Sequence, residues 1–155
     1  MIRNKAPGRF IVALLAAVLI FPDVVGAQEN GIGHPPFLSP HASSILKNGD
    51  HVFAVNTPAD TVDVIDASSR AIIARIDVGI DSVGIAARPD GKEIWVTNHV
   101  SDSVSVIDSD PQSVTYLYVV ATVQDFDPLT RATRFDEPVG VAFASNEKAY
   151  VALSS

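Results

Sequence analysis

The amino-acid sequence predicts an all-β fold made of repeated units, each with four short antiparallel strands. Three observations lead to this fold class. Shifting the chain by 42 residues superimposes seven identical pairs between residues 49 and 108. Short apolar segments alternate with turns rich in Pro, Gly, Asp and Asn. Beyond residue 27, no segment has apolar residues at the three- and four-residue intervals of an amphipathic helix.

Residues 1–27 are predicted to be a signal peptide. Arg3, Lys5 and Arg9 precede the apolar run 10–21, and Val-Gly-Ala at 25–27 provides a small-residue cleavage site. A helix rises about 1.5 Å per residue, so this run is well short of a hydrocarbon core about 30 Å thick. A buried helix and an uncleaved membrane anchor are the alternatives. We therefore expect an exported protein, periplasmic, secreted or at the cell surface, whose only membrane contact is through this signal.

Residues 28–41 are predicted to be a linker, because Gly and Pro interrupt any regular pattern. His34 and His41 lie here without the neighbouring ligands that a metal site requires, so we interpret them as loop residues. Removing the signal changes the net charge from −7 to −9, which argues against nucleic-acid binding. The absence of cysteine excludes disulfides, thiolate zinc sites and covalent c-type haem attachment within these 155 residues.

The repeats begin after the linker, the first at 42–79 and the second at 82–137. A third copy starts at 139, where Val-Gly-Val-Ala matches Val-Gly-Ile-Ala of the second repeat, and it continues to 155. Phe53, Trp95 and Tyr150 share one repeat position, so packing between units is their expected role. The spacing to the third copy is 56 residues, which gives the second repeat about fourteen additional residues, placed at 124–138.

Each repeat resolves into short strands separated by turn residues. The expected strands are 42–46, 51–56, 61–66 and 71–78, then 83–87, 93–98, 103–108 and 115–123. Four strands at this period are typical of a β-propeller blade. The sequence thus contains about two and a half blades, whereas propellers close with roughly four to eight. We expect the remaining blades in further sequence of the same full-length chain, which makes these residues an N-terminal fragment.

Three segments of the second repeat carry a family resemblance. They are Arg-Pro-Asp-Gly-Lys at 88–92, Trp-Val-Thr-Asn at 95–98 and Ser-Val-Ser-Val-Ile-Asp at 103–108. This pattern resembles the YVTN-type β-propeller repeat family, although Ser82 stands where the pattern has proline and the third repeat lacks the asparagine. The resemblance implies a propeller fold. It allows several functions, because similar propellers occur in surface proteins and beside haem or quinone chemistry.

The additional residues of the second repeat are the main candidate for an individual function, because insertions are where members of a fold acquire binding sites. Their charged residues are Asp125, Asp127, Arg131, Arg134, Asp136 and Glu137. The acids are suitable oxygen ligands for calcium, and the alternative is that the two arginines pair with them. No EF-hand-type calcium loop is present. We therefore favour contact with a partner or ligand over a calcium site.

Polar residues at strand ends are expected to have structural roles. The residues concerned are Asn56, Asp66, Asn98 and Asp108. Such side chains commonly hydrogen-bond turn amides, and we favour this role over a ligand-binding rim. His99, Asp102 and Ser103 have the composition of a catalytic triad, but closeness in sequence does not create its geometry. No catalytic residue is assigned.

Two functional classes remain. The favoured one is an exported propeller that acts as a ligand- or protein-binding scaffold, with no catalysis and no cofactor in these residues beyond the calcium alternative. The other is the propeller domain of a larger periplasmic enzyme, either a haem- or quinone-dependent redox enzyme or a hydrolase. In that case the catalytic part belongs to further sequence, because these residues contain no phosphate loop and no nucleophile elbow.

Overall fold

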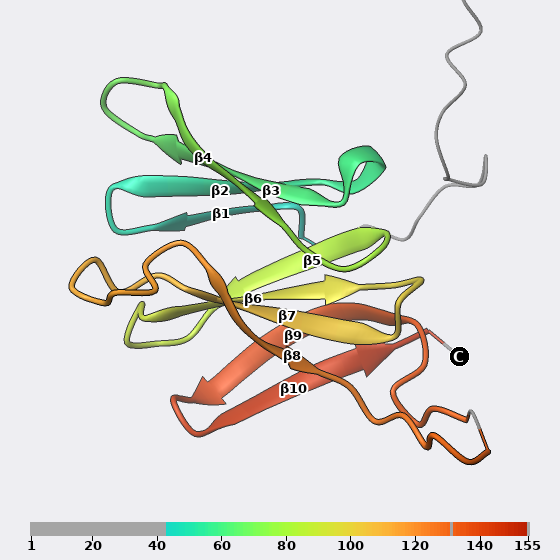
Figure 1. Cartoon of the computed structure of the whole chain (residues 1–155). Helices are drawn as coiled ribbons and strands as arrows, with labels where there is room; N and C mark the ends of the chain where they lie inside the picture. Colours follow the sequence, from blue (N-terminus) through green and yellow to red (C-terminus); the bar gives the residue numbers. More distant parts are fainter. Residues whose placement is uncertain (1–42, 131, 155) are drawn as a thin grey trace, which may run out of the picture. The chain divides into compact units, whose positions relative to one another are not determined.

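The computed structural model describes residues 43–130 and 132–154, all of which belong to one compact unit (Figure 1). The predicted signal peptide and linker, with His34 and His41, lie outside these residues. Strands account for most of the regular structure, and the single helical element described is the short 3-10 turn η1 (Thr57–Ala59). In this part of the chain, no helix is long and apolar enough to cross a membrane.

The first sheet has four antiparallel strands in sequence order. They are β1 (Ile45–Asn48), β2 (His51–Asn56), β3 (Thr61–Asp66) and β4 (Ile72–Asp77). The predictions for the two central strands are confirmed to the residue, and those for the outer two differ at their ends. Gly49 joins β1 to β2 at φ +56°, a left-handed conformation in which glycine has no Cβ to clash.

The second sheet repeats this order. Its strands are β5 (Ser82–Ala87), β6 (Glu93–Asn98), β7 (Ser103–Asp108) and β8 (Val119–Val123). The predicted last strand, 115–123, starts too early. The Asp108 N–H donates to the Tyr118 carbonyl at 2.9 Å, and the Leu117 N–H donates to the Asp108 carbonyl at 2.8 Å. These bonds close a turn, so the strand begins only at Val119.

The third sheet is a hairpin of two antiparallel strands, β9 (Pro138–Ser145) and β10 (Lys148–Leu153). β9 is the counterpart of β5, the first strand of the second sheet, as the third copy in the sequence predicts. The described part of the chain therefore contains two four-stranded sheets and a two-stranded one (Figure 1).

The main core lies between the first and second sheets. Successive side chains of a strand point to opposite faces of its sheet, so every second apolar side chain of each sheet enters this interface. Its buried members are Phe53, Val62, Val64, Ile76, Ile85, Ile94, Val96 and Ile107. Fully burying one such side chain stabilises a fold by about 1.5–3 kcal/mol. Phe53 is only 1% exposed, which confirms its predicted packing role.

The second and third sheets meet at Trp95 and Phe143, whose rings pack edge to face with centroids 5.2 Å apart. Beside them, a Cβ on Gly84 would lie 2.7 Å from the carbonyl oxygen of Val139, so glycine is required for β9 to approach β5. The packing role of Trp95 is thus confirmed. Tyr150, at the equivalent position of the third repeat, is 58% exposed.

The additional residues of the second repeat are divided between two connections. Residues 109–118 join β7 to β8, where 67–71 join β3 to β4. Residues 124–137 join β8 to β9, where 78–81 join β4 to β5. The larger part therefore precedes the third sheet as expected, but a smaller part enlarges the turn after β7.

Candidate functional site

Residues 124–130 and 132–137 form a small hairpin, called the insertion hairpin below. Phe126 and Thr133 form an antiparallel bridge. Next to it, the Asp127 N–H donates to the Ala132 carbonyl at 2.9 Å. The two arms of the insertion hairpin therefore pair with each other through their backbones, and this pairing positions the side chains that they carry.

Asp127 shapes the tip of the insertion hairpin. Its Oδ1 accepts the backbone N–H groups of Leu129, at 2.8 Å, and Thr130, at 3.3 Å. These bonds lower the pKa of Asp127, because they stabilise the charged carboxylate, and the bond from Leu129 has the largest effect. The residue therefore combines a turn role with a fixed negative charge.

Arg134 and Asp125 face each other across the two arms of the hairpin. The Arg134 Nε donates to the Asp125 Oδ2 at 3.0 Å. Both side chains are exposed, and exposed ion pairs contribute only about 0–1 kcal/mol to stability. The predicted pairing of an insertion arginine with an acid is confirmed for this residue, whereas Arg131 lies outside the described residues.

An open hollow of about 220 Å³ lies between these side chains. Its lining residues are Asp125, Asp127, Thr130, Ala132 and Arg134. Two carboxylates and one guanidinium around a small hollow favour a group that both donates and accepts hydrogen bonds. Three of the predicted site residues are thus brought together.

The two other predicted acids lie apart from this hollow. Asp136 does not line it, and Glu137 is at the base of the hairpin. The Glu137 N–H donates to Asp102 Oδ1 at 3.0 Å, and its Oε2 accepts the Ser154 hydroxyl at 2.8 Å. Glu137 therefore fixes the hairpin to the turn before β7 and to the end of β10.

Calcium binding stays a prediction. Among residues 43–130 and 132–154, no three His, Asp or Glu side chains gather closely enough to hold one metal ion. Of the proposed ligands, the hollow is lined by Asp125 and Asp127. An ion bound here needs further oxygen ligands, and Thr130 is the neutral side chain in the lining that offers one.

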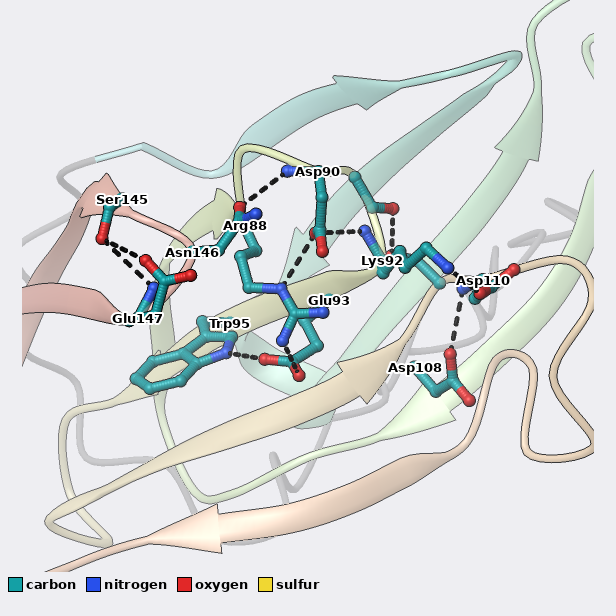
Figure 2. Close-up of polar contacts among 12 residues, drawn as sticks. Arg88, Asp90, Lys92, Glu93, Trp95, Asp108, Asp110, Ser145, Asn146 and Glu147 are labelled. Carbon is teal, nitrogen blue, oxygen red and sulfur yellow. Dashed lines mark hydrogen bonds and ion pairs between the residues drawn. The ribbon is translucent and has the colours of Figure 1, made fainter.

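A network of charges covers the turn between β5 and β6 at the opposite end of the second sheet. Figure 2 shows Arg88 between Asp90 and Glu93. Its Nε donates to Asp90 Oδ1 at 2.9 Å, and this bond raises the pKa of Arg88 and lowers that of Asp90. Glu93 also accepts the indole N–H of Trp95 at 2.9 Å.

The network extends to the turn after β7. Lys92 Nζ pairs with Asp110 Oδ2 at 2.8 Å, which raises the pKa of Lys92 and lowers that of Asp110 (Figure 2). The Asp90 N–H donates to Asn146 of the third sheet at 3.1 Å. Because the charges are paired with one another, we interpret the network as a structural link between sheets. Sequence reasoning missed it, although the alternating charges at 88–93 were a signal.

The turn role predicted for the strand-end aspartates is confirmed. Asp66 Oδ1 accepts the N–H and hydroxyl groups of Ser68 and Ser69. Asp108 accepts the Asp110 N–H at 2.9 Å and the Thr115 hydroxyl at 2.6 Å. Both carboxylates therefore organise the turns that follow their strands.

The same prediction is wrong for the asparagines. Asn98 is completely buried, and its Nδ2 donates to the hydroxyls of Ser103, at 3.1 Å, and Ser105, at 3.0 Å. It thus cross-links β6 to β7 inside the sheet interface. The side chain of Asn56 makes no capping hydrogen bond to the 3-10 turn that follows it. The two asparagines share one repeat position, but Asn98 is buried and hydrogen-bonded to two serines, whereas Asn56 caps no turn.

His99, Asp102 and Ser103 have separate partners. The backbone N–H of His99 donates to the Asp81 carbonyl at 2.9 Å, and Asp102 holds the insertion hairpin at Glu137. The Ser103 hydroxyl accepts from Asn98. No hydrogen bond within the described residues links the three side chains into a nucleophile, base and orienter.

Comparison with known proteins gives matches at the level of structure. No family model and no curated protein matches the sequence. Hydrazine synthase of Kuenenia stuttgartiensis matches 78% of this chain and 31% of its own, at 26% identity and a TM-score of 0.58. Dihydro-heme d1 dehydrogenase NirN matches 77% of this chain and 24% of its own, at 19% identity and a TM-score of 0.57.

A further match is the β-propeller domain of Cps50 (Swd1) from Myceliophteria thermophila, over 76% of this chain and 34% of that one. The identity is 12% and the TM-score 0.53. The chain thus spans about a quarter to a third of the length of these solved chains. Together with the antiparallel four-stranded sheets, these matches confirm the predicted fold class, a partial β-propeller.

Proposed function

We propose that this chain is an exported β-propeller protein of the YVTN type that binds a protein or small-molecule partner through the insertion hairpin. The observation that carries the proposal is the hollow between Asp125, Asp127 and Arg134, held by a hairpin with its own backbone pairing. Propellers supply a rigid support of stacked sheets, and loops on such supports commonly provide the contact residues.

The tip of the insertion hairpin also presents apolar surface. Leu129 is 93% exposed, and Phe126 is about half exposed. Interfaces commonly surround an apolar contact with charged and polar groups that fix its orientation. The hairpin has both kinds of group within ten residues, which favours a partner that combines an apolar part with a hydrogen-bonding part.

Capture from the exported-protein fraction of the source cells tests this role. The bait is the 155-residue chain, compared with a Phe126→Ser, Leu129→Ser variant and with a Val114→Ser control, because Val114 is exposed in another connection. We expect one partner to be retained by the wild type and the control and lost by the hairpin variant. Identical capture by all three would contradict the proposal.

Calcium binding is tested on the same hairpin. Titration of the chain with Ca²⁺, followed by NMR of the Asp125, Asp127 and Thr130 amides, separates ion binding from partner binding. Saturable shifts at these residues that disappear in Asp127→Asn would support a calcium site. Shifts spread over all exposed acids would indicate nonspecific binding and remove calcium from the proposal.

A second candidate is the propeller domain of a larger redox enzyme. The match to hydrazine synthase, at 26% identity, is the observation that favours it. These residues lack cysteine, so any covalently attached haem would depend on other sequence. Reading the open reading frame on both sides decides between the candidates. A Cys-x-x-Cys-His motif would favour the enzyme, and plain continued repeats would favour the scaffold and provide the remaining blades.

Export is tested directly by the mature N-terminus. If residues 1–27 are a signal peptide, the protein recovered from the periplasm or medium begins at Gln28. Mass spectrometry of the recovered chain measures this. Recovery of the intact Met1 form from the cytoplasm would overturn the assignment to an exported protein.

A further inference from the structure

A separate hollow lies where the first and second sheets meet, and we call it the junction hollow. It is lined by residues of the β1–β2 and β5–β6 turns, among them Gly49, Asp50 and Gly91, and by Pro111 of the connection between β7 and β8. Figure 1 shows these three connections at the same end of the two sheets, away from the insertion hairpin. The volume of the junction hollow is about 320 Å³, within the range of roughly 300–1,000 Å³ that is usual for small-molecule sites.

The connection between β7 and β8 is the part of this site in which the two repeats differ. Residues 109–118 form a longer connection than the one between β3 and β4 in the first repeat. Tyr116 of this connection lies against His51 of β2, with its phenolic oxygen 3.3 Å from His51 Nδ1. A second link comes from Asn48, whose Nδ2 donates to the Gly91 carbonyl at 2.8 Å. The junction hollow is therefore bounded by elements of two repeats that side-chain contacts hold together.

The lining of the junction hollow is rich in hydrogen-bond acceptors. Asp50 and Asp90 bring carboxylates, and Asn48 brings an amide oxygen. Among the described residues, the hydrogen bonds to the Asp90 carboxylate come from Arg88 Nε and the Lys92 N–H, and both use Oδ1 (Figure 2). Its Oδ2 is therefore available to a further donor.

The turn between β1 and β2 already holds an ammonium group. Lys47 Nζ donates to the carbonyl oxygen of Gly49 at 2.6 Å, so the backbone here presents an acceptor to a cation. No Lys or Arg belongs to the described residues that line the junction hollow, whereas Arg134 lines the hollow of the insertion hairpin. The net charge of −7 further attracts cations to the chain. A positively charged donor therefore fits this lining better than an anion.

We propose that the junction hollow binds a small organic amine in its ammonium form. An ammonium group has three donors and no acceptor, so carboxylate, amide and carbonyl oxygens can all receive its hydrogen bonds. Asp50 and Asp90 supply the charged acceptors. Phe53 and Pro111 supply apolar lining for the carbon chain of the amine. The inference adds a second binding site to the scaffold and does not depend on the insertion hairpin.

Titration with putrescine tests the proposal on the full 155-residue chain. The control probe is butanediol, which has the same carbon chain with neutral hydroxyl ends. NMR at fixed ionic strength follows the amides of Gly49, Asp50 and Gly91. We expect saturable shifts of these amides with putrescine and none with the diol. No shift at millimolar putrescine, or equal shifts with the diol, would overturn the proposal.

Substitution of single carboxylates locates the binding. Asp50→Asn should weaken putrescine binding about three- to tenfold, because a charged acceptor is replaced by a neutral group of similar shape. Asp77→Asn is the matched control, since Asp77 is exposed in β4 and its substitution changes the net charge equally. We expect this control to bind as the wild type does. Equal affinity of both variants, or shifts spread over all exposed acids, would assign the binding to net charge and overturn the proposal.

Two further comparisons identify the source of the ammonium group. Tighter binding of putrescine than of acetyl-lysine amide would assign it to a free amine, and the reverse order would assign it to a lysine side chain of a partner. Binding of putrescine by Lys47→Met but not by the wild type would show that the chain's own ammonium fills the site, which would overturn the proposal. The Phe126→Ser, Leu129→Ser variant should bind putrescine normally, so this proposal and the hairpin proposal fail independently.

Discussion

The side chain of Asp60 accepts a hydrogen bond from the backbone N–H of Asp81, with Oδ1 2.8 Å from the nitrogen. Asp60 lies in the turn between β2 and β3, and Asp81 immediately precedes β5, so the bond ties the first sheet to the start of the second. Asp102 and Glu137 repeat this relationship at 3.0 Å between the second and third sheets. All four residues have positive φ, between 46° and 58°.

Removing the carboxylate of Asp60 should loosen the junction of the first two sheets. We expect Asp60→Ala to lower the free energy of unfolding by about 1–2 kcal/mol, because the hydrogen bond from the Asp81 N–H to a charged acceptor is lost and alanine tolerates positive φ poorly. Urea denaturation measures this change. Asp60→Asn is the matched control, since it retains an acceptor and tolerates the left-handed conformation. Equal losses for both variants would show that the hydrogen bond is not what matters.

The two repeat asparagines should respond very differently to truncation. Asn98→Ala removes two buried hydrogen bonds, those to the hydroxyls of Ser103 and Ser105, so we expect a loss of about 2–3 kcal/mol. Asn56→Ala, at the same repeat position, should cost less than about 1 kcal/mol, because its side chain does not cap the turn that follows. Thermal or urea unfolding of the two variants measures the difference. Similar losses would contradict the assigned environments.

The strands of this chain were predictable where the repeat is seen twice. β2, β3, β6 and β7 have the predicted bounds, because their apolar alternation and closing Asn or Asp recur at 42 residues. β8 was less predictable. The apolar and aromatic residues of 115–118 have strand propensity, but hydrogen bonds to Asp108 hold them in a turn.

The site was predictable only as a set of charges. The sequence placed Asp125, Asp127 and Arg134 in one insertion, and the structure brings them around one hollow. No alternation of apolar and polar residues predicts the pairing of Phe126 with Thr133. The hydrogen bond of Glu137 is to Asp102, which lies 35 residues earlier in the sequence. Tertiary contacts of this kind leave no periodic signal in the sequence.

Trp95 is the single tryptophan, so its fluorescence reports on the contact between the second and third sheets. Phe143→Ala removes the ring that packs edge to face on the indole. We expect a red shift of the emission and a loss of about 1–3 kcal/mol in unfolding free energy, since an aromatic contact and apolar area are lost together. Ala144→Ser, on the exposed side of β9, is the control. An unchanged emission maximum in Phe143→Ala would show that the two sheets do not pack in this way.

Acid should destabilise the turn after β7 through Asp108. Burial raises the pKa of this carboxyl, but hydrogen bonds from Ser113, Thr115 and the Asp110 backbone together outweigh burial and hold the pKa below its ordinary value. A carboxyl with a lowered pKa in the folded state stabilises the fold above its unfolded pKa of about 3.9, and this contribution disappears as the pH falls through the folded pKa.

We therefore expect unfolding free energy to vary little with Asp108 between pH 7 and about pH 5, and to fall below about pH 4. Urea denaturation across this range measures the profile. Asp108→Asn keeps one of the two acceptor oxygens that the Asp110 N–H and the Thr115 hydroxyl use, and it does not titrate, so its acid dependence should be shallower than that of the wild type. The same titration in high salt separates these hydrogen bonds from screened surface charges. Superimposable profiles for the variant and the wild type would exclude Asp108 as a source of the acid sensitivity.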